Sequence, residues 1–208
     1  MTTEEIRKVY NDDEAALLFS GDFEEALFNT FREHANRFAW VMNFVRTRAP
    51  RSVLDVACHN GLLGRLFRWQ RGAAPTSIEG VDIAPLSLEL ARVRGKYNTV
   101  HCLDIREDFD LGRKFDLVLG LEILEHVFYS TPVLTNIRRH AAKWVLLSTP
   151  FQLGQVDGVL HVRHVDPRKM LEEIEAVFGV PANLDFVPAV FHDRNEWLGW
   201  YMYSLEAR

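Results

Sequence analysis

Two carboxylates and a histidine stand close together in the segment Glu122-Ile123-Leu124-Glu125-His126. Their spacing of three and four residues predicts that the side chains of Glu122, Glu125 and His126 share one face of a helical turn. Two carboxylates and an imidazole can bind a divalent cation such as Mg²⁺, Mn²⁺ or Zn²⁺. In the alternative interpretation, the glutamates support the structure and His126 is a general base or a packed histidine.

Two more histidines, His161 and His164, follow the apolar run from Trp144 to Pro150, which is typical of a buried strand. If this strand ends at the same sheet edge as Glu125, His161 can complete the metal shell, with His164 in reserve. We therefore assign His126 and His164 as candidate catalytic residues. The candidate metal ligands are Glu122, Glu125, His126 and His161.

A different chemistry is indicated by the run from Val53 to Gly64, which reads as a buried strand, a tight turn and the start of a helix. Small residues at such a turn let backbone N–H groups approach a ligand, and Gly61 can bring the helix close to the strand. Two later apolar segments end in Asp82 and Asp104. An acid at the position of Asp82 can accept hydrogen bonds from two ribose hydroxyls.

A parallel sheet would bring these strand ends together. After Pro50 the chain alternates strands and helices, which predicts parallel strands joined by right-handed crossovers. We expect helices over about residues 61 to 71, 85 to 95, 132 to 142 and 167 to 178. Capping residues and first-turn prolines are expected at Thr131 with Pro132 and at Asp166 with Pro167, and Gly179 suits a helix end. Two aromatic-rich strands close the chain, Leu184 to Val190 and Trp197 to Leu205.

The segment before Pro50 has another pattern. Apolar residues recur at helical spacing from about Asp22 to Arg46, which predicts one long amphipathic helix. We expect residues 1 to 49 to form a helical cap or lid, and residues 50 to 208 to form the main domain. The apolar face of the helix either packs onto the sheet or a partner copy, or it covers the substrate pocket.

The strand-end segments, taken in order, resemble the class I S-adenosylmethionine-dependent methyltransferases, in particular the subgroup with a Glu-x-x-Glu-His segment after the fourth strand. The resemblance covers about residues 50 to 205. It implies an α/β fold, with a Rossmann-like open sheet of about seven strands, mostly parallel with an antiparallel C-terminal strand, and helices on both faces. It places the ribose on Asp82 and the adenine amino group on Asp104. The implied cofactor-binding residues are Asp55, Ala57, Cys58, His59, Gly61, Asp82, Ile83, Asp104, Ile105 and Leu121.

The first turn departs from the family's Asp/Glu-x-Gly-x-Gly-x-Gly pattern, because Ala57 and His59 replace two of the three glycines. Histidine tolerates positive φ better than most residues, so the turn can keep its shape. The imidazole of His59 either lines the cofactor pocket or blocks it. An inactive, methyltransferase-like binding or scaffold protein therefore stays open as an alternative.

Composition narrows the expected partners. The chain has 208 residues, with 24 Lys and Arg against 29 Asp and Glu, which gives a net charge of −5. This balance, without a basic block, argues against a nucleic-acid partner. The amino terminus lacks the pattern of a signal peptide and no apolar run is long enough to span a membrane, so we expect a cytoplasmic protein. We expect it to be a monomer or a homodimer. Cys58 and Cys102 are expected to be reduced thiols.

The expected reaction is transfer of a methyl group from a sulfonium donor to a hydroxyl oxygen of a small-molecule or sugar-like acceptor. Nitrogen and carboxylate acceptors stay open as alternatives. For such an activated donor, the protein supplies alignment, a dry pocket, and a base or divalent metal. Methylation of the 3′-terminal ribose of RNA is an alternative, although the acidic charge opposes it. A nicotinamide-dependent oxidoreductase fits less well, because the first turn matches a phosphate-cradling loop poorly.

Overall fold

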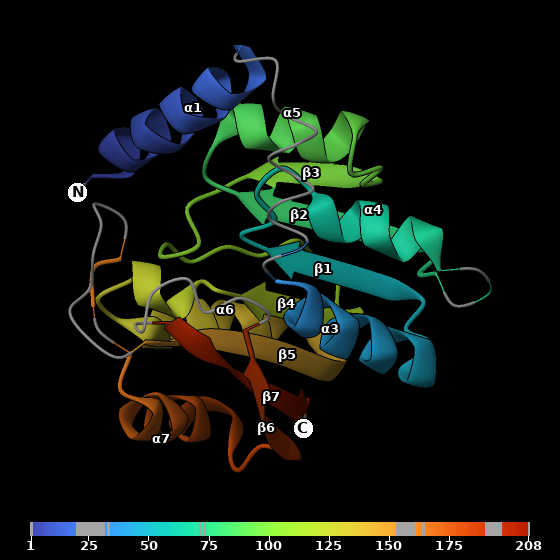
Figure 1. The fold of residues 1–208 in the computed structure, drawn as a ribbon, viewed down its shortest axis with the longest axis vertical. Coiled ribbons are helices and arrows are strands. Elements are labelled where there is room, and N and C mark those ends of the chain that lie inside the picture. The colour runs from blue at the N-terminus through green and yellow to red at the C-terminus, as the bar shows by residue number, and fades with distance from the viewer. Residues whose placement is uncertain are drawn as a thin grey trace.

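The computed structural model describes residues 2–19, 32, 34–70, 72, 74–152, 161–163, 165–189 and 197–207. Seven strands form one sheet in the order β3-β2-β1-β4-β5-β7-β6 (Figure 1). Strands β1 to β5 run parallel to one another, and β7 is antiparallel to both β5 and β6. This arrangement confirms the predicted fold class. The strands are β1 Ser52–Val56, β2 Ser77–Asp82, β3 Thr99–Cys102, β4 Phe115–Leu121, β5 Ala141–Gln152, β6 Asn183–Pro188 and β7 Trp197–Glu206.

The order of the strands reverses at β1, because β2 and β3 continue on one side of it and β4 and β5 on the other. In open α/β sheets, ligands bind beyond the carboxyl ends of the strands at such a switch point. The topology therefore places a ligand site between the loops that follow β1 and β4.

Helices cover both faces of the sheet, so the central strands β1, β2 and β4 are buried, whereas the edge strands β3 and β6 are largely half-buried or exposed. One apolar cluster joins the sheet to α3, α4 and α5 through residues such as Val41, Phe67 and Ala91. The other joins it to α6 and α7 through residues such as Ile137 and Ile174. The helical elements are α1 Thr3–Phe19, α3 Ala35–Arg48, α4 Leu62–Trp69, α5 Pro85–Val93, the 3-10 turn η1 Leu124–His126, α6 Ser130–His140 and α7 Pro167–Phe178.

Helix ends were predicted well at α7 and poorly at α6. Asp166 caps α7 by accepting hydrogen bonds from the backbone N–H groups of Arg168 and Lys169. Helix α6 begins two residues before Pro132 and has no side-chain cap, so the cap predicted at Thr131 is wrong. A proline fits this position because the first backbone N–H groups of any helix have no partner within the helix.

The amino-terminal segment holds two described helices. Helix α3 confirms the carboxyl half of the predicted long helix, while residues 20–31 and 33 lie outside the described part of the chain. Helix α1 was not predicted, because charged residues interrupt its apolar pattern. It lies against α5 at the β3 side of the sheet (Figure 1).

Candidate active site

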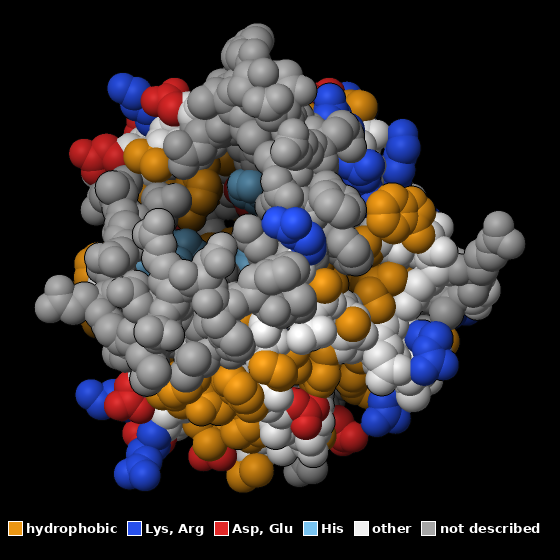
Figure 2. All heavy atoms as spheres, viewed as in Figure 1, with side chains coloured by type: hydrophobic (Ala, Val, Ile, Leu, Met, Phe, Trp, Pro, Cys, Tyr) orange, Lys and Arg blue, Asp and Glu red, His pale blue; other side chains and the backbone are white. Residues whose placement is uncertain are grey.

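A cavity of about 610 Å³ lies at the carboxyl ends of the strands. On the face drawn in Figure 2, hydrophobic and histidine side chains lie at the bottom of an opening. Ile6 and Tyr10 of α1 and Arg37 and Phe38 of α3 also belong to the cavity wall. The wall further includes nine predicted cofactor residues, Asp55, Ala57, Cys58, His59, Asp82, Ile83, Asp104, Ile105 and Leu121.

The loop after β1 keeps the backbone shape that the family's glycines would give. Ala57, His59 and Gly61 have φ values of 60°, 48° and 80°, so all three glycine positions are left-handed. Gly61 does not belong to the cavity wall, and its role is packing. A Cβ atom added there would lie 2.6 Å from the Cα atom of Ala91 in α5. The substitutions to alanine and histidine have therefore preserved the turn.

Asp82 ties this loop to β2 and faces the cavity. Its Oδ2 accepts a hydrogen bond from the backbone N–H of His59 at 2.9 Å, and its Oδ1 accepts one from Ala84 at 3.0 Å. Burial raises the pKa of the Asp82 carboxyl, and these hydrogen bonds oppose that rise. Each carboxylate oxygen keeps a further acceptor position for a ligand hydroxyl.

Asp55 lies behind the loop in a buried polar pair. The hydroxyl of Tyr97 donates a hydrogen bond to its Oδ2 at 2.5 Å. Burial raises the pKa of Asp55 to about 7, although the Tyr97 hydrogen bond favours the ionised form. Gly64 makes room for this pair, since a Cβ atom there would lie 2.3 Å from the Tyr97 ring.

Asp104 is held by two neighbours. Arg106 donates to both carboxylate oxygens, and the hydroxyl of Thr3 in α1 donates to Oδ2 at 2.6 Å. Burial alone would raise the pKa of Asp104, but the hydrogen bonds from Arg106 and Thr3 lower it to about 2. This carboxylate is therefore ionised and fully engaged with protein donors.

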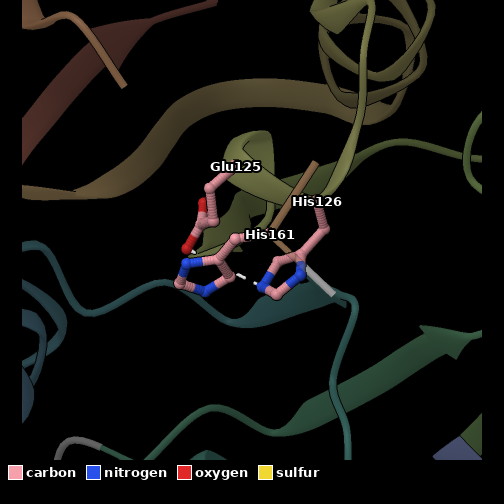
Figure 3. Close-up of side chains that lie close together, drawn as sticks. All are labelled: Glu125, His126 and His161. Carbon is pink, nitrogen blue, oxygen red and sulfur yellow. Dashed lines mark ion pairs between the residues drawn. The ribbon is translucent and has the colours of Figure 1, made fainter. Parts of the chain in front are cut away.

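Three of the predicted metal ligands come together at the other side of the cavity. One ligand atom from each of Glu125, His126 and His161 lies within 4.8 Å of the others. Nε2 of His126 is 3.8 Å from Oε1 of Glu125, and the rings of His126 and His161 meet edge to face at 4.8 Å. Figure 3 shows the carboxyl group and both imidazoles pointing into a common space. The backbone N–H of Val162 donates to the Glu125 carbonyl at 3.0 Å, which fixes the histidine segment against η1.

Burial shifts the pKa values of two members of this cluster, Glu125 and His161. The side chain of Glu125 is almost fully buried, and its Oε2 has no hydrogen-bond partner among the described residues. Burial, and then the nearby charge of Glu122, raise the pKa of Glu125 well above its ordinary value. Burial also lowers the pKa of His161. Burial therefore favours the uncharged forms of both Glu125 and His161.

Glu122 stands apart from this cluster, so the predicted shared helical face is wrong. Its φ of 53° turns the chain before η1 begins. Its carboxylate accepts hydrogen bonds from Ser148 at 2.8 Å and from Trp200 at 3.0 Å, and it pairs with Arg37 at 3.4 Å. Burial raises the pKa of Glu122, and the charge of Arg37 opposes this rise.

The sequence analysis did not identify Arg37 as a site residue, and the structure does not test the catalytic role predicted for His164. Arg37 is buried, and its guanidinium lies over the Trp200 ring at 5.4 Å. The signal was present, because a cation beside the apolar positions Phe38 and Val41 in a predicted helix must find a partner. His164 lies outside the described residues, so its catalytic role stays a prediction.

A doubly wound sheet, an acid at the end of β2, a left-handed loop after β1 and an antiparallel β7 define a class I S-adenosylmethionine-dependent methyltransferase. The chain belongs to the methyltransferase domain family, whose sequence pattern matches residues 25–202.

Curated relatives and a solved structure agree with this assignment. The chain is 31% identical over 106 residues to a mitochondrial ubiquinone biosynthesis O-methyltransferase of Candida albicans, covering 47% of this chain and 32% of that protein. It is 30% identical over 154 residues to the ubiquinone biosynthesis O-methyltransferase of Neisseria meningitidis, covering 70% of this chain and 57% of that protein. The fold is similar to that of the N-methyltransferase NodS from Bradyrhizobium japonicum in complex with S-adenosyl-L-homocysteine. That match has a TM-score of 0.62 and 14% identity, covering 82% of this chain and 85% of NodS.

The chain thus spans between about a third and just over half of these two curated relatives. None of the described helices combines the length and apolar character that crossing a membrane requires. The cytoplasmic location and the oligomeric state stay predictions.

Proposed function

We propose that this protein transfers a methyl group from S-adenosylmethionine to a hydroxyl oxygen of a small-molecule acceptor. One observation carries the proposal: a single cavity joins the Asp82 loop at one side to His126, with Glu125 behind it, at the other. The first side fits a nucleoside, and the second holds a group that can accept a proton. The names of the curated relatives, which are O-methyltransferases, support an oxygen acceptor.

The residues of the cavity fit the cofactor. Asp82 offers carboxylate oxygens to ribose hydroxyls, and Ile83 and Ile105 offer apolar surface to a purine. The buried Arg37 offers positive charge to a carboxylate, and its Nε has no hydrogen-bond partner among the described residues. When bound, S-adenosylmethionine supplies an electrophilic methyl group.

The protein's own contribution to the reaction is to activate and orient the acceptor. The imidazole of His126 accepts the proton of the acceptor hydroxyl, which makes the oxygen a better nucleophile. Nε2 of the resulting imidazolium lies 3.8 Å from Oε1 of Glu125, and its positive charge favours the ionised form of that carboxyl group, which stabilises the imidazolium in return. The apolar residues of the cavity wall exclude water from the acceptor oxygen.

A divalent cation is the second candidate for activating the acceptor. Glu125, His126 and His161 supply one oxygen and two nitrogen atoms, a ligand set that suits Mn²⁺ or Zn²⁺. Binding would require Glu125 to lose its proton, so metal affinity would rise with pH. Chelator treatment followed by metal readdition separates the two candidates: full activity after chelation favours His126 as a base.

The proposal is tested by methyl transfer from labelled S-adenosylmethionine to phenols, sugar alcohols, amines, carboxylic acids and short RNA, with the product atom located by mass spectrometry. We expect label on a hydroxyl oxygen of a small molecule. His126→Gln should lower kcat by about 10² to 10⁴. His101→Gln is the matched control, because His101 lies on β3 and pairs with Glu79. Label on nitrogen or RNA, or an unchanged kcat in His126→Gln, would contradict the proposal.

A further inference from the structure

Helix α1 is fastened across the adenosine side of the cavity. Thr3, Arg7 and Asn11 recur every four residues and so lie on one face of the helix. The hydroxyl of Thr3 donates to Asp104, and Nε of Arg7 donates to the carbonyl of Ile83 at 3.2 Å. Two further α1 residues, Ile6 and Tyr10, belong to the cavity wall.

The third contact of α1 supplies a hydrogen-bond acceptor to the first turn of α5. Oδ1 of Asn11 accepts a hydrogen bond from the backbone N–H of Leu86 at 3.1 Å. Leu86 lies in the first turn of α5, whose N-cap residue, Ala84, provides no side-chain cap. The docked position of α1 is therefore specific, since it satisfies a backbone donor that α5 leaves open.

Asp104 has no acceptor position left for a ligand in this arrangement. Its Oδ1 accepts from the backbone N–H of Arg106 at 3.0 Å and from Nε of Arg106 at 2.9 Å. Its Oδ2 accepts from the Thr3 hydroxyl at 2.6 Å and from Nη2 of Arg106 at 2.5 Å. Nε of Arg106 also shares its hydrogen with Oδ2 at 3.2 Å. A carboxylate has about four acceptor positions, and these hydrogen bonds occupy them.

We propose that α1 is a lid over the adenosine side of the cavity, with Asp104 as its anchor, and that this lid opens whenever the cofactor enters or leaves. The inference rests on the proposed use of S-adenosylmethionine. It assigns Asp104 to the lid in place of the adenine amino group. It also places the cover at the cofactor side, whereas an acceptor-pocket cover was expected from the sequence.

The lid is tested by stopped-flow binding of S-adenosylhomocysteine to Thr3→Val, which removes one hydroxyl and keeps the side-chain shape. Because the hydrogen bond to Asp104 forms only when the lid is closed, association and dissociation should both become about tenfold faster. The dissociation constant should change by less than about threefold, since both rates rise together. Hydrogen exchange of the α1 amides should also become faster.

Thr47→Val is the matched control, because among the described residues the Thr47 hydroxyl bonds only to the Asn43 carbonyl within α3. It should leave both rates unchanged. Unchanged rates in Thr3→Val, in a protein that binds S-adenosylhomocysteine, would overturn the lid. Absence of binding by the native protein would instead overturn the proposed function on which the lid rests.

The role of Asp104 has its own test, the preference for S-adenosylhomocysteine over S-inosylhomocysteine, which carries oxygen in place of the adenine amino group. We expect Asp104→Asn to speed both rates as Thr3→Val does and to keep the native preference. A preference lost in Asp104→Asn would show that Asp104 binds the adenine amino group and would overturn its assignment as the lid anchor.

Discussion

The backbone N–H of His59 donates a hydrogen bond to Oδ2 of Asp82 over 2.9 Å. This bond joins the loop after β1 to the end of β2, so the residue that we propose to bind the ribose also holds the loop in place. Because the donor is the backbone, the bond does not depend on the histidine side chain. A loop that has lost two glycines therefore stays closed.

The left-handed backbone of this loop predicts a stabilising substitution. Ala57→Gly should raise the free energy of unfolding by about 0.5 to 1 kcal/mol, because glycine removes the strain of a positive φ but adds entropy to the unfolded chain. Urea unfolding at constant m-value measures the change. Ala141→Gly, at a φ of −83°, is the control and should destabilise the protein. Equal destabilisation by both substitutions would show that residue 57 is unstrained.

The ion pair of Arg37 and Glu122, whose side chains are 9% and 19% exposed, predicts a non-additive loss of stability. Arg37→Met should lower the free energy of unfolding by about 3 kcal/mol, because it leaves the Glu122 carboxylate buried without its cation. Adding Glu122→Gln should recover part of that loss, since the neutral amide no longer needs a counter-charge. Chemical unfolding of the two single variants and the double variant measures the coupling. Additive losses would mean that the two side chains do not interact.

The raised pKa of Asp55 predicts that this group stabilises the fold at acid pH. The folded state keeps the Asp55 proton up to about pH 7, whereas the unfolded chain releases it near pH 4. Its contribution is therefore complete below about pH 4 and falls as the pH rises towards 7. Asp55→Asn imitates the protonated acid, so its stability should exceed that of the native protein more at pH 8 than at pH 5. Urea titrations at the two pH values supply the comparison, and an equal difference at both would refute it.

Sequence patterns predict some parts of the candidate site and miss others. Asp82 and Asp104 were expected at one edge of the sheet, and both belong to the cavity wall there, because parallel strands deliver their carboxyl ends to one edge. Glu122 was misplaced because one left-handed residue turns a chain out of helical phase, and residue spacing carries no sign of it. His161 reached Glu125 through a backbone hydrogen bond between distant segments, a contact that was inferred only from the shared edge.

Helix α1 was missed for a different reason. Its hydrogen bonds to the rest of the protein come from polar side chains, and the helix lacks the continuous apolar stripe that marks a buried face. The polar residues of α1 make these contacts only because the fold brings their partners close. Thr3 pairs with Asp104, Arg7 with Ile83 and Asn11 with Leu86. Long-range pairing of this kind is decided by tertiary structure.

Calorimetric titration of the protein with S-adenosylhomocysteine tests the central claim most directly. We expect the native chain to bind one molecule, and Asp82→Asn to bind at least about tenfold more weakly, because hydrogen bonds to a charged group contribute about 1.5 to 3 kcal/mol. His101→Asn, at a residue that does not belong to the cavity wall, should bind like the native chain. No binding by the native protein, or native affinity in Asp82→Asn, would contradict the assignment of this cavity as the cofactor site.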